Sequence, residues 1–186
     1  VDHRDVIRSY QSYLEVSTDP ELRVRVAHRI AGLKLQWDEI RMDQFGDDID
    51  AMVAEDREMA EASIGDYETL LELYPDRIDN DTIYYQLAKA YSLAGRQNQA
   101  IAVLEELTER YPESIYYLES QFRLGRMLYN VSDFEASENR FAQVVEFGPD
   151  GNQYYPDAQY FRGWALFKQN RLEDSLLAFT EMIDEH

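Results

Sequence analysis

The sequence predicts an all-α fold, a right-handed superhelix of stacked helical hairpins (an α-solenoid) with about nine helices. Two independent repeated features lead to this prediction. Small residues recur at a nearly constant interval, at Ala88, Gly125 and Gly163. Prolines recur at the same interval, at Pro75, Pro112 and Pro149. Such a period is typical of hairpins that each bury an apolar face against the next, because one hairpin alone has no core.

Three segments align at this period, and each reads as two helices joined by a short turn: Tyr84–Pro112, Gln121–Pro149 and Gln159–Glu185. The small residue of the first helix allows the second helix to approach closely, and small residues also recur in the second helix, at Ala100, Ser137 and Ser175. We expect Phe141 and Phe179 to fill the space between one hairpin and the next. Each closing proline ends a second helix, because proline has no backbone N–H.

The chain before these hairpins is less regular. Arg4–Val16 has helical spacing of its apolar residues, and Asp19-Pro20 starts a helix that we expect to extend to about Met42. An acidic segment, residues 43–61, follows. Ser63–Tyr74 then has the pattern of the second helix of a hairpin. We therefore predict one solenoid segment, irregular over residues 1–62 and regular over 63–186.

The repeated residues resemble the signature of the tetratricopeptide repeat (TPR). In the first full repeat the matching residues are Tyr84, Leu87, Ala88, Tyr91, Ala100, Leu104 and Pro112. The departures are Gln121 and Gln159, where an aromatic residue is usual, and Arg162, where leucine is usual. The repeat length and the Tyr-Tyr pairs at the entry to each hairpin resemble bacterial cell-envelope TPR proteins, similar to the outer-membrane assembly lipoprotein BamD and the periplasmic Tol-associated coordinator. The resemblance implies a periplasmic or envelope-associated protein, with a cytoplasmic location as the alternative.

The two ends of the predicted array differ from capped solenoids. The first predicted helix has the pattern of the second helix of a hairpin. At the other end, Leu172–Glu185 has apolar residues with no following helix to cover them. Solenoids normally carry a polar capping helix at each end. We therefore expect either a longer repeat protein or self-association through these terminal helices.

Composition excludes several classes of function. The 186 residues are 45% hydrophobic and 13% aromatic, which predicts a folded chain. The formal net charge of −19 repels phosphate, so we expect no nucleic-acid partner. The chain has no cysteine, which excludes disulfides and thiolate chemistry. No apolar run is long enough to span a bilayer, so we expect no direct membrane insertion.

The sequence offers no catalytic or metal-binding constellation, and we predict a protein that is not an enzyme and carries no cofactor. Its histidines are His3, His28 and His186, too widely separated for a triad or a metal cluster. Two acidic stretches, residues 43–61 and 76–81, lack the glycine spacing of a calcium-binding loop. A solvated charged helix explains the first stretch better.

The family resemblance places partner contacts on the outward positions of each first helix, which line a concave groove. In this sequence those positions carry Tyr85, Lys89, Phe122, Arg123, Arg126, Tyr129, Tyr160, Trp164, Phe167 and Lys168. Aromatic residues and arginine are enriched in binding hot spots. We predict a protein-interaction scaffold that binds a peptide or partner helix in this groove, although any one of these rings could instead pack between helices. The alternatives are a helical accessory region of a larger enzyme, such as a murein-processing protein, and an acidic cytoplasmic TPR regulator.

Overall fold

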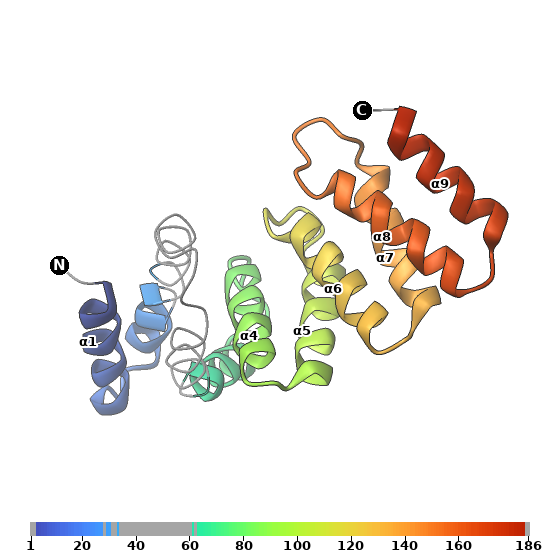
Figure 1. The fold of residues 1–186 in the computed structure, drawn as a ribbon. Helices are drawn as coiled ribbons and strands as arrows, with labels where there is room; N and C mark the ends of the chain where they lie inside the picture. The colour runs from blue at the N-terminus through green and yellow to red at the C-terminus, as the bar shows by residue number, and fades with distance from the viewer. Residues whose placement is uncertain (1–2, 28, 31–32, 34–60, 62, 185–186) are drawn as a thin grey trace. The chain divides into compact units, whose positions relative to one another are not determined.

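The structure is a computed structural model that describes residues 3–27, 29–30, 33, 61 and 63–184 (Figure 1). All regular secondary structure in these residues is helical. The chain forms two compact units, Val1–Ala100 and Ile101–His186. The predicted boundary between irregular and regular helices, at residues 62 and 63, stays a prediction.

The N-terminal unit contains α1 (His3–Val16), helical segments at residues 20–27 and 63–73, and α4 (Asp81–Leu93). Asp19 caps the 20–27 segment, because its Oδ1 accepts hydrogen bonds from the N–H groups of Glu21 and Leu22 at 3.1 and 3.3 Å. The predicted end of this helix near Met42 and the acidic segment up to residue 60 lie outside the described residues. The predicted helix at Ser63–Tyr74 is confirmed, one residue shorter.

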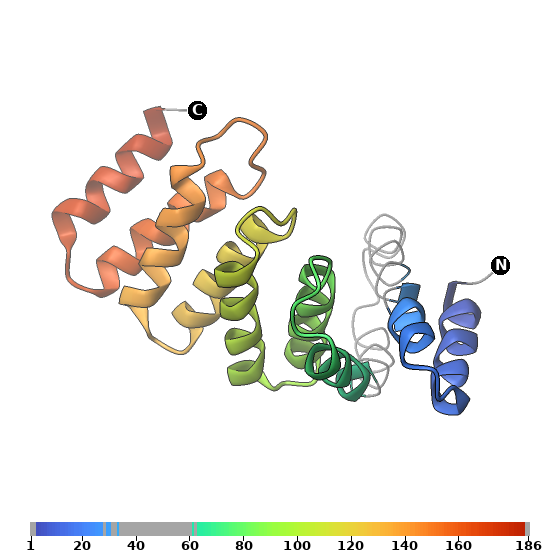
Figure 2. The same cartoon turned by 180° about the vertical axis from the view of Figure 1, so that it is seen from behind.

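The helix α5 (Gln97–Arg110) crosses the boundary between the units, and four helices follow it: α6 (Tyr117–Asn130), α7 (Phe134–Glu146), α8 (Tyr155–Lys168) and α9 (Leu172–Asp184). Within the C-terminal unit, each of α6, α7 and α8 packs on the next helix, and α6 also touches α8 (Figures 1 and 2). The predicted hairpins are confirmed here. The described residues contain seven labelled helices and the two helical segments, in agreement with the predicted number.

In each C-terminal hairpin a glycine of the first helix lies directly against a phenylalanine ring of the second. A Cβ added to Gly125 would lie 2.6 Å from the Phe141 ring, and one added to Gly163 would lie 2.6 Å from the Phe179 ring. A serine one turn before each phenylalanine fixes the same crossing. Ser137 donates to the carbonyl of Gly125 at 2.8 Å, and Ser175 donates to that of Gly163 at 2.9 Å. The predicted role of the small residues is confirmed for these two hairpins, with hydrogen bonds that the spacing did not predict.

Phe141 also joins one hairpin to the next, as predicted. Its side chain is fully buried and packs with Val144 of α7 and Ala158 of α8. The Phe161 ring of α8 stacks on it, with centroids 5.8 Å apart and planes inclined by 21°. Phe141 therefore contacts both its own hairpin and the one that follows.

The first helix of each hairpin ends at a residue in the left-handed region. These residues are Gly95, Ser132 and Asn170, with φ of 78°, 67° and 62°. In each case the N–H of the next residue donates to a carbonyl five residues back, at 2.8 to 3.0 Å, as in a Schellman motif. Serine and asparagine thus adopt the conformation for which glycine is the usual residue.

The departure from the TPR signature at Arg162 has a structural reason. Its Nε donates to Glu138 Oε1 of α7 at 2.9 Å, and the side chain of Glu138 is only 9% exposed. Arg171 lies 3.7 Å from the other oxygen of Glu138. An ion pair thus links α7 to α8 at a position where leucine is usual.

In the N-terminal unit, Tyr91 of α4 ties this helix to the 63–73 segment. Its hydroxyl donates to Glu68, and its side chain is buried. Burial and this hydrogen bond raise the pKa of Tyr91 to about 12. The neutral phenol is therefore the form that the fold stabilises.

We predict that Phe141→Ala lowers the free energy of unfolding by about 3 to 5 kcal/mol, because it opens a cavity against Gly125 and Phe161. Chemical denaturation measures the effect. Phe147→Ala removes an exposed ring of similar size and serves as the control, with an expected loss of less than about 1 kcal/mol. A loss below about 1 kcal/mol for Phe141→Ala would contradict this packing.

Gly125→Ala is expected to destabilise the chain by about 1 to 3 kcal/mol, because the new methyl group overlaps the Phe141 ring. Gly65→Ala is the matched control. Gly65 lies in the 63–73 helix with nothing within 4 Å of an added Cβ, so alanine should raise stability by up to about 1 kcal/mol. Equal effects in thermal or chemical melts would show that the α6–α7 contact is looser than described.

We predict that stability falls as the pH rises from about 10 to 12, through the ionisation of Tyr91 in the unfolded chain. A phenol whose folded pKa is raised contributes its full stabilisation below the ordinary pKa of about 10 and loses it as the pH approaches the folded value. Denaturation of the chain and of Tyr91→Phe across this range measures the contribution. The stability difference between them should shrink, and a constant difference would argue against the raised pKa.

Candidate partner-binding surface

The first helices of the two C-terminal hairpins carry most of the predicted contact residues. We call this surface, formed by Phe122, Arg123, Arg126 and Tyr129 of α6 and by Tyr160, Phe161, Trp164, Phe167 and Lys168 of α8, the α6–α8 face. Positions 122, 123, 126 and 129 of α6 correspond, one repeat later, to positions 160, 161, 164 and 167 of α8. Because α6 touches α8, the two sets belong to neighbouring helices of one unit.

Aromatic rings form a continuous network across these helices. The Phe122 ring stacks on Tyr154 at 5.4 Å and meets Phe161 edge to face at 6.3 Å. Phe161 in turn contacts Tyr160 at 5.3 Å, and Tyr160 contacts Trp164 at 6.2 Å. Ring pairs of this kind contribute stability beyond that of the area they bury. These contacts therefore favour fixed positions for the side chains of the surface.

The outer end of this network is exposed. Tyr160, Trp164 and Phe167 are 42%, 36% and 48% exposed. Trp164 lies edge to face with Phe167 at 5.7 Å and with the Phe179 ring of α9 at 5.8 Å. Three adjoining aromatic side chains that stay open to solvent are the kind of surface that partner proteins use.

Arg126 lies next to these rings. Its guanidinium carbon is 4.2 Å from the centroid of Phe161, a cation–π contact across the two helices. The side chain is exposed, and no ion pair joins it to any residue that the structure describes. Because the side chain is exposed, its N–H groups can donate to an acceptor from a partner.

The remaining predicted residues are less available. Tyr85 is buried, with 3% of its area exposed, so the expected outward position is wrong for this residue. Lys89 is half-buried, with its Nζ 5.8 Å from the Tyr85 ring. Phe122 is half-buried in the ring network, and Tyr129 is half-buried against Phe134 at 5.2 Å. Much of the predicted set thus contributes to packing.

Arg123 is held within its own helix. Its Nε and Nη2 donate to Glu119 Oε1 at 2.8 and 2.7 Å. The same carboxylate acts on Tyr154, whose pKa is raised above its ordinary value by burial first and then by Glu119.

The predicted residues that remain for partner contact are Arg126, Tyr160, Trp164, Phe167 and Lys168.

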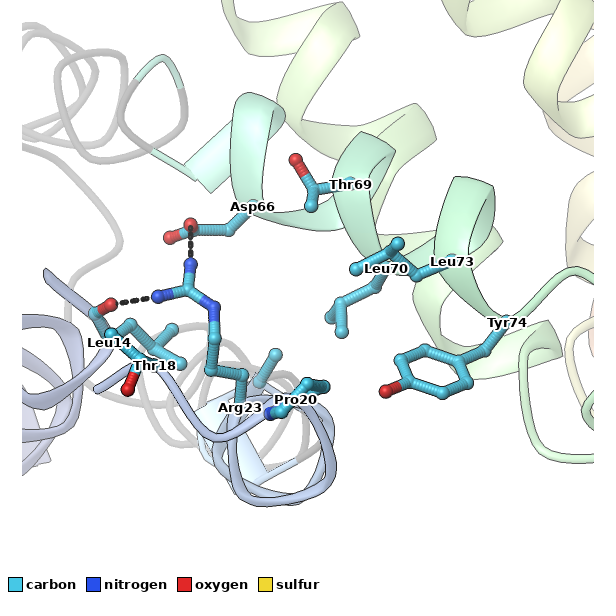
Figure 3. Close-up of a pocket in the computed structure, with 10 residues that line it drawn as sticks. Leu14, Thr18, Pro20, Arg23, Asp66, Thr69, Leu70, Leu73 and Tyr74 are labelled. Atoms are coloured by element: carbon cyan, nitrogen blue, oxygen red, sulfur yellow. Dashed lines mark hydrogen bonds and ion pairs between the residues drawn. The ribbon is translucent and has the colours of Figure 1, made fainter.

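The N-terminal unit contains a pocket that sequence reasoning missed (Figure 3). The cavity has a volume of about 210 Å³ and lies between the end of α1, the 20–27 segment and the 63–73 helix. Arg23 braces its wall. The guanidinium donates to the carbonyls of Leu14 and of Ser17, the latter at 3.0 Å, and lies 3.7 Å from Asp66. This pocket is formed by helices that are far apart in the sequence, so no sequence motif predicts it. The one available signal is a charged residue, Arg23, between apolar residues of its helix.

A second apolar surface lies on α9. Leu172, Leu176 and Leu177 are all more than half exposed. The equivalents of Leu176 and Leu177 on α7, one repeat earlier, are Glu138 and Asn139. Self-association through this helix stays a prediction.

The described residues hold no group of three or more His, Asp or Glu side chains that could bind a metal ion. None of the helices described has both the length and the apolar character needed to cross a bilayer.

Residues 83–114 match the tetratricopeptide repeat family model. The match spans α4 and α5, so the tetratricopeptide repeat that the sequence predicts there is confirmed. No curated protein matches the sequence. The proposed likeness to particular envelope proteins therefore has no support from a relative.

Solved helical-repeat structures resemble the whole chain. MamA of AMB-1 is 18% identical with a TM-score of 0.59, and the match covers 99% of this chain and 97% of MamA. The TPR-like repeats of a putative kinesin light chain from Podosopora anserina are 14% identical with a TM-score of 0.53, covering 98% of this chain and 92% of the other. At such identities the likeness concerns the fold alone, and it confirms the predicted all-α solenoid.

Proposed function

We propose that the chain is a non-catalytic protein-interaction scaffold whose α6–α8 face binds a peptide or a partner helix. One observation carries the proposal. Three adjoining exposed aromatic side chains, Tyr160, Trp164 and Phe167, lie on the same face as Arg126, which has no ion pair within the described residues. Aromatic rings bury a large area at small entropic cost, and arginine adds directional hydrogen bonds.

The two tyrosines with displaced pKa values fit a structural role for this chain. Catalytic sites concentrate such groups in a pocket. Here the pKa values of Tyr91 and Tyr154 are displaced by burial and by a single neighbouring carboxylate, and the two residues belong to different units. An accessory helical region of a larger enzyme would use the same face and is the alternative.

We also propose an envelope-associated location. Its support is the repeat length and the Tyr-Tyr pairs at the start of α6 and α8, which resemble those of envelope TPR proteins. The alternative is a cytoplasmic location, as for a TPR regulator. Fractionation of cells that produce the chain distinguishes the two locations.

A cross-linked pull-down from envelope and cytosolic extracts tests the site. The native chain is compared with Arg126→Glu, Trp164→Ala, after circular dichroism has shown that the variant is folded. We expect the variant to lose a partner that the native chain captures. The control is Asn139→Asp, Phe147→Ala, which changes exposed residues outside the α6–α8 face and should keep the partner.

Retention of the same partner by Arg126→Glu, Trp164→Ala would move the binding site to another surface, such as α9. Loss of the partner in the control as well would indicate a general effect of acidity or stability.

A further inference from the structure

The distribution of ion pairs in the C-terminal unit is uneven. Its arginines other than Arg126 each pair with an acidic side chain of the same unit: Arg110 with Glu106, Arg123 with Glu119, Arg140 with Glu105, Arg162 with Glu138, and Arg171 with Asp174. Arg126 and Lys168 form no ion pair with any residue in the described part of the chain. Both lie on the α6–α8 face.

This arrangement is unexpected for so acidic a protein. The chain has 37 acidic residues against 18 basic ones, so carboxylates are abundant near most surface cations. Two cations that form no ion pair among the described residues lie on the same face as the exposed aromatic rings and add positive charge to it. Charge complementarity therefore favours an acidic partner.

Arg126 is prepared for such a partner. Its guanidinium lies over the Phe161 ring, with Cζ 4.2 Å from the ring centroid, and this cation–π contact favours one placement of the side chain. A carboxylate in the plane of the guanidinium can accept two parallel hydrogen bonds from it. A lysine at this position would supply the charge without the fixed pair of donors.

The residue types on the α6–α8 face change from one repeat to the next. Arg123 and Arg126 of α6 are replaced at the equivalent positions of α8 by Phe161 and Trp164. The face is therefore cationic over the middle of α6 and aromatic over the middle of α8. Lys168 lies one turn beyond Trp164, in the last turn of α8.

We propose that the partner segment is an acidic peptide with a bulky apolar residue near its carboxylate. The carboxylate binds Arg126 over α6, and the apolar side chain covers Tyr160 and Trp164 of α8, with Lys168 as a second, weaker attraction. This inference rests on the proposed function, because it names the chemistry of the partner for the same face. The proposed acidic partner differs from what the net charge of −19 alone would favour, because a negative chain attracts basic peptides.

Selection from a displayed random peptide library tests the inference, because it does not require the natural partner to be identified first. The full chain is the bait, and the selected peptides are synthesised and titrated against the chain and its variants. We expect the selected sequences to share Asp or Glu close to Leu, Phe or Trp. Arg126→Gln and Arg126→Lys should each weaken such a peptide about tenfold or more, because a charge-assisted bidentate contact is lost.

The matched control is Arg110→Gln. It makes the same change in charge at an exposed arginine of α5 outside the α6–α8 face, and it should alter affinity less than about twofold. Replacing the acidic residue of the peptide by its amide should weaken binding to the native chain but not to Arg126→Gln. That non-additivity identifies Arg126 as the group that binds the carboxylate.

The remaining outcomes separate the two proposals. Basic or neutral peptides that depend on Trp164 would overturn the acidic partner and retain the face as a binding site. Peptides that bind Trp164→Ala and Arg126→Gln as tightly as the native chain, or a selection that yields no peptide, would count against both.

Discussion

The contact between a glycine of one helix and a phenylalanine ring of the next sets the helix spacing in the C-terminal unit. With Gly125 against Phe141 and Gly163 against Phe179, the helices of each hairpin approach closely enough for a serine hydroxyl to reach the glycine carbonyl. Phe141 then extends to Phe161 of the following hairpin. Because Phe161 also supports Arg126, the packing that stacks the hairpins also positions the candidate site.

The periodicity of small residues and prolines predicted this fold well, because both features follow from backbone geometry that repeats with each hairpin. Details that depend on a single pair of side chains were not predictable. Arg162 departs from the signature, yet its reason, a buried Glu138 on the preceding helix, is visible only in three dimensions. Ser132 and Asn170 likewise adopt the left-handed conformation for which glycine is usual, in caps formed by backbone hydrogen bonds.

The candidate site was predictable in part. Helical spacing identified which residues share a face, but it could not separate rings that pack from rings that stay exposed. Tyr85 is buried and Trp164 is exposed although both occupy first helices, because burial depends on what the neighbouring helices bring to each position. The N-terminal pocket braced by Arg23 was not predictable, since it joins helices that lie far apart in the sequence.

Charge and aromatic surface together define what the face can do. A strongly acidic chain keeps Arg126 and Lys168 without ion pairs among the described residues, next to exposed rings. The most direct test places the photo-cross-linking residue p-benzoylphenylalanine at position 167, or at position 147 as a control, in cells that produce the chain. A discrete protein adduct from position 167 and none from position 147 is the predicted result. Adducts from position 147 alone would contradict the assignment of the α6–α8 face as the binding surface.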